Sequence, residues 1–384
     1  MGEPACRSCR GRTGHLVLDL GEQPPCDYFP RRDDPGPDPA YPLQMWLCSS
    51  CGLAQLVADP TVPEEPRGAE PAALVEQAAD AVRQVAAAGL LPGSGLVAEY
   101  GSPHGGSWLG LLARHGLTPS RDGEPADIVL DCFGLMHAAD QAAGLAERVA
   151  RVAAGGVLLL QYHSLATIIR CGQWNALRHG HYAYYSTTAL AAMLAAHGCS
   201  LRRAWQFPLY GGTVLLAATR NAGPAGPDSP AGPHSGPDSS VQSLLADDGR
   251  AGVRDPAVLG GLQRSALARA GGLRAWLAAE RSAGRTVLGY GAASRAVALL
   301  RRADVDSALL PAVVDASPAK QGLRMPGTDI PVVSPDQLAV RRPAAVVLFL
   351  SDLMTEVRTA FPEVEAAGGR WVDADTLGGS PAGG

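Results

Sequence analysis

This sequence has little of what marks membrane, secreted or nucleic-acid-binding proteins. No run in its 384 residues approaches the roughly 18 apolar residues that a membrane-spanning helix needs. The opening residues, MGEPACRSCRGR, contain no apolar stretch of the kind found in secretory signals. A formal net charge of −5 gives no electrostatic reason to expect nucleic-acid binding. We therefore expect a cytoplasmic protein without membrane or nucleic-acid partners.

Lysine is almost absent, and cysteine is sparse. The chain has 31 arginines and a single lysine, Lys320. Together with the abundant Ala, Gly and Pro, this bias indicates genome composition rather than function. Eight cysteines in 384 residues do not make a disulfide scaffold. A hydrophobic content of 46% is enough for substantial cores, and the length allows two or three domains.

Four of the cysteines form two Cys-x-x-Cys pairs. Cys6 and Cys9 make the first pair, Cys48 and Cys51 make the second, and 38 residues lie between them. Four thiolates in this arrangement suit one tetrahedral zinc ion. A site with four protein ligands is closed, which favours a structural role over a catalytic one. The alternative, two disulfides, would need an oxidising compartment. Cys26 lies between the pairs and is left over.

Composition and periodicity change along the chain. Residues 93–219 alternate apolar runs with helical patterns, which predicts an α/β domain. Residues 220–240 are rich in Pro, Gly and Ser, which predicts a flexible linker. A helical segment followed by further apolar strands predicts a second α/β unit. The expected divisions are 1–60 for a zinc-binding domain, 61–219 for a central domain, 220–250 for the linker and 251–384 for a C-terminal domain.

Longer motifs carry a family resemblance. The N-terminal segment reads LGEQPPCDYF and then YPLQMWLCSSCGLAQL, and the C-terminal segment reads LGYGAASRAVALL and then VVDASPAKQGLRMPGTDIPVVSPDQL. These motifs resemble the SAM-dependent sugar C-methyltransferases, which methylate keto-deoxysugar nucleotides in antibiotic pathways. The resemblance covers nearly the whole chain, but its middle matches in outline only.

The resemblance implies an α/β fold of three modules. These are a small N-terminal zinc-binding domain, a shortened Rossmann-like methyltransferase domain and a C-terminal Rossmann-like domain that binds substrate. It also implies a structural zinc ion, S-adenosyl-L-methionine (SAM) as methyl donor and a nucleotide-linked keto-sugar as substrate. The active site is expected between the modules, with His181 facing it.

The first strand of the central domain ends in part of a SAM-binding pattern. Methyltransferases of this class place an acidic residue and a Gly-rich turn there, so that SAM can approach the backbone. This chain supplies Glu99, Gly101, Gly105 and Gly106. We expect these four residues to bind the cofactor, although any strand-to-helix turn favours glycine.

The part that normally holds the ribose of SAM is too short. Only 25 residues separate Gly101 from the next strand at Asp127, whereas a βαβ unit needs about 30. A second strand ending in a carboxylate, a helix and a third strand do not fit, although Asp122 or Glu124 could substitute from a loop. The Tyr/Ser-rich stretch that the family carries after its zinc module is also missing. Both gaps predict weakened or lost SAM binding.

Two histidines mark the expected catalytic loop. Where the family places Tyr-His-Glu-His, this chain has Arg178, His179, Gly180 and His181. Histidine titrates near neutrality and suits removal of a proton beside a ketone. The resemblance gives that role to His181, with His179 beside it, and Arg178 could stabilise an enolate or a phosphate. Alternatively, both histidines are polar residues of an aromatic loop, or they bind a metal ion. His104, His137 and His163 could lie nearby.

The C-terminal module is expected to bind the sugar nucleotide. Tyr290 lies in a Gly-rich turn whose following helix could receive phosphate. Lys320 falls inside the longest motif and is the best candidate for a phosphate contact, although it could be an ordinary surface lysine. Tyr184, in the aromatic run after His181, is a further expected substrate contact.

Three functions compete on this sequence. The first is a sugar C-methyltransferase in which His181 deprotonates the carbon beside a ketone and SAM methylates the enolate. The second is a SAM-independent enzyme that forms the same enolate and acts as an epimerase, isomerase or dehydratase. The third is a non-catalytic partner, which the altered catalytic groups would allow.

Overall fold

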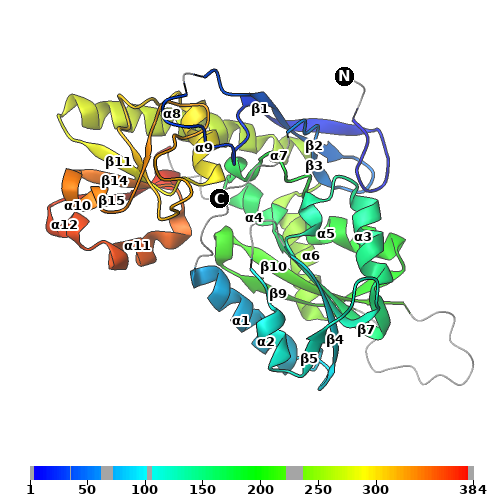
Figure 1. Cartoon of the computed structure of the whole chain (residues 1–384). Coiled ribbons are helices and arrows are strands. Elements are labelled where there is room, and N and C mark those ends of the chain that lie inside the picture. Colours follow the sequence, from blue (N-terminus) through cyan, green and yellow to red (C-terminus); the bar gives the residue numbers. More distant parts are fainter. Residues whose placement is uncertain (1–3, 35, 62–71, 102–105, 222–236, 379–384) are drawn as a thin grey trace, which may run out of the picture.

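The computed structural model describes residues 4–34, 36–61, 72–101, 106–221 and 237–378. Three sheets organise the molecule (Figure 1): an N-terminal sheet across the top, a central sheet at the lower right and a C-terminal sheet on the left. In the described segments, no helix combines the length and apolar character that crossing a bilayer requires. The predicted mixed α/β class is confirmed.

The N-terminal sheet is antiparallel, and its last strand comes from the central module. Its strand order is β1-β2-β3-β8. The strands are β1 (Gly14–Gln23), β2 (Tyr41–Cys48), β3 (Ala54–Leu56) and β8 (Ala183–Tyr184). Because β8 begins two residues after His181, this sheet connects the zinc-binding segment to the expected catalytic loop.

The central sheet has the strand order β5-β4-β6-β7-β10-β9, with β10 antiparallel to both of its neighbours. Its strands are β4 (Gly95–Tyr100), β5 (Leu117–Pro119), β6 (Ala126–Cys132), β7 (Val152–His163), β9 (Cys199–Phe207) and β10 (Thr213–Arg220). Helices α1 (Ala72–Ala87) and α2 (Leu109–Ala113) cover one face. Helices α3 (Gln141–Ala150), α5 (Thr187–Ala196) and α6 (Ser239–Ala251) cover the other, and α4 (Leu165–Arg170) follows β7.

Two predictions about this module need correction. Residues 117–119, in the stretch that we judged too short for further strands, form the short edge strand β5, which pairs in parallel with residues 95–97 of β4. The described chain from Pro119 to Ala126 then runs directly into β6, so the predicted absence of a third strand is confirmed. Helix α6 lies inside the range predicted as linker, because Val241 and Leu244 are apolar and buried against the central module.

The C-terminal sheet is entirely parallel, with the strand order β13-β12-β11-β14-β15. Its strands are β11 (Val287–Tyr290), β12 (Val313–Val314), β13 (Val332–Val333), β14 (Ala345–Leu348) and β15 (Arg370–Asp373). Helices α8 (Gly261–Ser282) and α9 (Ser294–Arg302), preceded by α7 (Pro256–Leu259), share one core with the N-terminal sheet. Helices α10 (Gln337–Arg341), α11 (Met354–Ala360) and α12 (Glu363–Ala366) pack on the opposite face.

A buried ion pair joins the N-terminal segment to the C-terminal module. The guanidinium of Arg324 donates to both carboxylate oxygens of Asp38, each at 2.6 Å, and both side chains are 8% exposed. The amide of Gly327 also donates to Asp38 at 2.7 Å. Such bidentate pairs fix orientation as well as distance, so the Pro/Asp-rich loop around Asp38 docks in one place.

Candidate active site and zinc centre

The N-terminal cysteines form a four-thiolate zinc centre. Their Sγ atoms all lie within 4.8 Å of one another. The Sγ–Sγ distance is 3.5 Å between Cys6 and Cys51 and 3.6 Å between Cys9 and Cys48. A tetrahedral zinc with Zn–S bonds of about 2.3 Å spaces its ligands about 3.8 Å apart, so the four sulfurs fit. The turn after Cys51 needs glycine, because Gly52 has a φ of +76°.

The zinc centre supports the loop that carries His181. Strand β3 begins three residues after Cys51 and pairs with β8, and the Leu56 amide donates to the Tyr182 carbonyl at 3.1 Å. Arg7, inside the first cysteine pair, donates to the Leu56 carbonyl at 3.2 Å. Its guanidinium also lies 4.7 Å from the centroid of the Tyr182 ring. Both cysteine pairs therefore hold the backbone next to His181.

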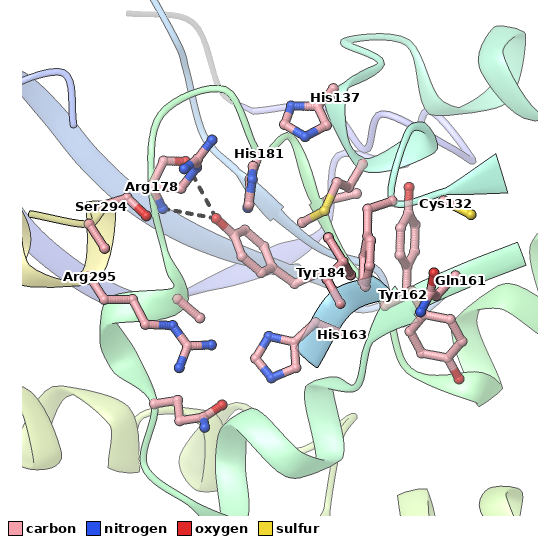
Figure 2. A pocket seen from close by; sticks show the side chains of 18 of the residues that line it. Cys132, His137, Gln161, Tyr162, His163, Arg178, His181, Tyr184, Ser294 and Arg295 are labelled. Carbon is pink, nitrogen blue, oxygen red and sulfur yellow. Dashed lines mark hydrogen bonds between the residues drawn. The ribbon is translucent and has the colours of Figure 1, made fainter. Parts of the chain in front are cut away.

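A cavity of about 350 Å³ lies where the three modules meet. The central module supplies the ends of β6 and β7 and the loop of His181, the C-terminal module supplies the first turn of α9, and the N-terminal segment supplies Asp27. This volume is within the range of small-molecule sites. Figure 2 shows the side chains of His137, His163, His181 and Arg295 gathered around it.

His181 and His137 form an edge-to-face pair on the cavity wall. Their ring centroids are 4.7 Å apart, with an interplanar angle of 87°. Burial, with a smaller contribution from the nearby Arg178 charge, lowers the pKa of His137 to about 4. His137 is therefore neutral at pH 7 and adds no positive charge beside His181. It lies five residues beyond the end of β6, where a polar side chain after a parallel strand is a usable sequence signal.

Arg178 and Tyr184 line the cavity, but their polar groups interact with other groups of the protein. The Arg178 guanidinium lies 3.5 Å from the Asp27 carboxylate. The Arg178 amide donates to the Tyr184 hydroxyl at 3.0 Å, and that hydroxyl donates to the Arg178 carbonyl at 3.4 Å (Figure 2). The Tyr184 ring therefore shapes the cavity while its hydroxyl fixes the loop.

His179 does not reach the cavity. Its Nε2 lies 3.3 Å from the Pro42 carbonyl, and its ring meets that of Tyr41 edge to face at 6.2 Å. Gly180, between the two histidines, has a φ of +83°, so the backbone turns there and the two side chains need not share a face. His179 is thus a contact to the N-terminal sheet, and this geometry does not support the catalytic role that we predicted for it.

The expected methyl-donor residues are only partly available. Glu99 accepts hydrogen bonds from the Ser107 hydroxyl and the Trp108 amide, both at 2.6 Å, so its carboxylate is bound to the turn before α2. Gly106 lines the cavity, but Gly101 does not. Gly105 lies outside the described residues.

No ribose anchor follows β5. Asp122 has a fully exposed side chain 3.8 Å from Arg151, and Glu124 accepts from the Arg121 amide at 2.9 Å. Neither residue lines the cavity. Asp131 does line it, but its buried carboxylate is bound by the guanidinium of Arg148 at 2.5 Å.

Of the two residues predicted to bind substrate in the C-terminal module, one lines the cavity and the other does not. Lys320 lines the cavity, where its Nζ donates to the Ala292 carbonyl at 2.8 Å and lies 3.9 Å from the Asp315 carboxylate. Tyr290 does not line the cavity. Its ring packs in the opposite core, 5.5 Å from that of Phe361 and 5.7 Å from that of Trp371 between centroids, because side chains alternate along β11.

Sequence reasoning missed Ser294 and Arg295. Both lie in the first turn of α9 and line the cavity. They belong to the motif LGYGAASRAVALL, so the signal was present. The side chains that follow a Gly-rich turn face the carboxyl ends of the strands, where ligands bind in parallel sheets.

Two protein-family models match the chain. Residues 6–64 match the model described as "Putative zinc binding domain", and residues 208–374 match the model described as "C-methyltransferase C-terminal domain". Among curated proteins, the C-methyltransferase NovU of Streptomyces niveus is 24% identical over 279 residues. That match covers 73% of this chain but only 60% of NovU.

Solved structures resemble the chain more loosely. A putative methyltransferase from Bacillus halodurans is 15% identical, with 38% of this chain and 99% of that chain covered and a TM-score of 0.29. Magnesium protoporphyrin IX methyltransferase from Synechocystis, solved with bound SAH, is 13% identical, with coverages of 39% and 84% and a TM-score of 0.29. Such scores say nothing about the reaction or the substrate.

Proposed function

Because the chain belongs to the family of C-methyltransferases that carry an N-terminal zinc-binding domain, we propose that it enolises a nucleotide-linked keto-sugar. His181 acts as the base. The observation that supports this is the place of His181 on the wall of a cavity to which all three modules contribute. The resemblance to NovU supports a small-molecule substrate, and the family's substrates suggest a keto-sugar nucleotide.

The first step is removal of a proton from the carbon beside the ketone. The imidazole of His181 takes the proton, the C–H electron pair forms a C=C bond, and the carbonyl π electrons move to oxygen. Neutral His137 adds no like charge that would disfavour the imidazolium at His181. Arg178, 3.5 Å from Asp27, brings positive charge to the same wall.

The described residues do not provide the usual ribose contacts for SAM. Glu99 is bound to Ser107 and Trp108. Asp122 and Glu124, which follow β5, do not line the cavity. A sheet without a third strand also offers less surface beside β5 for an adenosyl group. These residues therefore do not fit the usual SAM pocket.

A second outcome for the enolate is return of a proton instead of methylation. The missing ribose anchor favours this alternative, in which His181 or water returns the proton to carbon. The protein would then act as an epimerase or isomerase on the same scaffold. Both outcomes share the same enolate, and they differ only in the electrophile that quenches it.

Hydrogen exchange separates these possibilities. A thymidine diphosphate-linked 4-keto-6-deoxyhexose is incubated with the zinc-loaded protein in D₂O, with and without SAM. Deuterium uptake at a carbon beside the ketone without SAM supports enolisation. Isothermal titration with SAM then tests the donor. Micromolar or tighter binding, together with a product heavier by one CH₂ group, favours methyl transfer. No exchange and no binding of either ligand would support a non-catalytic role.

A further inference from the structure

His181 is the last residue of a tight turn in the catalytic loop. The His181 amide donates to the Arg178 carbonyl at 3.4 Å, which closes a four-residue turn. Gly180, the third residue of that turn, has a φ of +83°, as a type II β-turn requires. Types I and II differ by a flip of the central peptide, which carries the Gly180 N–H. The direction in which His181 leaves the turn therefore depends on what holds this N–H group.

The carboxylate of Asp59 holds the central peptide of the turn. Its Oδ2 atom accepts a hydrogen bond from the Gly180 amide, although Asp59 lies 121 residues earlier in the sequence. Its Oδ1 atom accepts from the Thr61 amide at 3.0 Å and from the Thr61 hydroxyl at 2.6 Å. One oxygen is thus fixed within its own loop, and the other is directed at Gly180. Hydrogen bonds to a carboxylate are stronger than those to a neutral carbonyl.

The backbone on both sides of this contact is anchored. Just before Asp59, the Val57 amide donates to the Gln44 carbonyl at 3.0 Å, which attaches the segment to the N-terminal sheet. Just after the turn, the Tyr182 amide donates to the Met136 carbonyl at 2.7 Å. These contacts fix the ends of the loop, whereas the contact with Asp59 fixes its middle. Precise placement of a reacting group requires support of this kind.

Asp59 acts on the loop from outside the cavity. It does not line the cavity, whereas His181 does. Burial lowers the pKa of His179, and the negative charge of Asp59 opposes this effect. The carboxylate therefore lies close to the turn without being placed to touch a substrate.

We propose that Asp59 is a positioning residue for the base: by holding the Gly180 amide, it keeps the turn in the form that directs the His181 imidazole at the cavity. This rests on the enolising function proposed above. Without the carboxylate, the central peptide is free to flip, and the imidazole leaves its working position while the rest of the cavity is kept. Proton removal then slows, because small displacements of a reacting group are costly, and substrate binding changes little.

The test compares variants of the zinc-loaded protein in the D₂O exchange assay with the thymidine diphosphate-linked 4-keto-6-deoxyhexose. D59A should lower the maximal exchange rate by about 10- to 100-fold, with little change in KM. D59N keeps one acceptor oxygen for the Gly180 amide and should recover part of that rate. A maximal rate of D59A equal to that of wild type, a loss confined to KM, or no recovery in D59N overturns the proposal.

Asp329 provides a matched control. Its carboxylate accepts from the Ser307 amide at 2.7 Å and from the Ser307 hydroxyl at 2.6 Å, so its hydrogen bonds resemble those of Asp59. It belongs to the C-terminal module and does not line the cavity. D329A should exchange at the wild-type rate, and both variants should keep their zinc. A loss of rate in D329A as large as in D59A, or a loss of zinc from D59A, overturns the positioning role.

Nuclear magnetic resonance keeps the test valid if D59A does not fold. In ¹⁵N-labelled wild-type protein, the Gly180 amide should exchange with solvent about 100-fold or more slowly than in an unfolded chain, because it is hydrogen-bonded. A Gly180 amide that exchanges as fast as in an unfolded chain overturns the proposal while enolisation stands. Wild-type protein that exchanges no hydrogen of the keto-sugar removes the enolising function, and the role of Asp59 falls with it.

Discussion

At the scale of residues, the cavity contains three histidines in different states. His137 and His163 have pKa values lowered to about 4 and about 3, mainly by burial, and both are neutral at pH 7. His181 touches the ring of His137 and the cavity, which leaves it as the candidate base. Different surroundings thus give one residue type different roles, as in other acid–base sites.

Replacing His181 tests the base directly. We expect H181Q to lower the exchange rate by roughly 100-fold or more, because general-base catalysis contributes about 10²–10⁴. Binding of the nucleotide should change little. H179Q is a close control, since His179 contacts the Pro42 carbonyl rather than the cavity. If H179Q lost exchange and H181Q kept it, the assignment of the base would be wrong.

The neutral histidines also predict a pH dependence of folding stability. Unfolded histidine titrates near 6.5, whereas His137 and His163 resist protonation until about pH 4 and pH 3. As the pH falls below about 6.5, the unfolded state binds protons that the folded state does not, so the free energy of unfolding decreases. Urea melts between pH 7 and pH 5 should show a smaller decrease for the H137Q/H163Q double variant than for H15Q. Equal slopes would contradict the burial of these rings as neutral groups.

At the scale of elements, the sequence pattern predicted the central strands of the sheets but not the short edge strand or the face on which each side chain lies. The missing third strand followed from counting residues between Gly101 and Asp127, because a βαβ unit cannot be compressed. Strand β5 was missed, since three residues ending in Pro119 carry too little pattern. Tyr290 was misplaced because a turn motif does not reveal which face of β11 its neighbours occupy. His163 and Arg295 come from different modules, and only the folded chain brings them together.

The C-terminal segment packs very closely on helix α8. A Cβ on Gly272 would lie 1.6 Å from the Leu377 carbonyl, while one on Gly271 would meet nothing within 4 Å. The same segment carries Asp375, which lines the cavity and binds Arg269 at 2.6 Å. We expect G272V to displace this segment and increase hydrogen exchange at residues 373–378, measured by mass spectrometry. G271V should leave that exchange unchanged, and equal protection in both variants would refute the close contact.

At the scale of the whole molecule, the modules are joined by contacts that the sequence could not reveal. Asp38 and Arg324 are each 8% exposed and form a bidentate pair across 286 residues of sequence. Removing one partner leaves a buried charge unpaired, so D38A should lower the free energy of unfolding by about 3–5 kcal/mol in urea melts. D33A is the control, because Asp33 pairs with Arg31 at the surface, where such pairs contribute little. Similar small effects for both variants would contradict the docking of this loop.

The zinc centre connects the N-terminal sheet to the catalytic loop through β3 and β8. Chelation should therefore release one equivalent of zinc, increase hydrogen exchange at residues 181–185 and abolish enolisation. The C48S variant should do the same without a chelator, whereas C26S should not, because Cys26 lies outside the four-sulfur cluster. If the amides of residues 181–185 stayed fully protected from hydrogen exchange in zinc-free protein, support of this loop by the zinc centre would be contradicted.

If the three-module cavity forms an enolate with His181 as base, hydrogen beside the substrate ketone must exchange with solvent. The most direct measurement is deuterium incorporation beside the ketone of a thymidine diphosphate-linked 4-keto-6-deoxyhexose, followed by NMR in D₂O without SAM. We expect incorporation with zinc-loaded wild-type protein well above the rate without protein, and none above that rate with H181Q. Recovery of unlabelled sugar from the wild-type reaction, or labelling that survives in H181Q, would contradict this expectation.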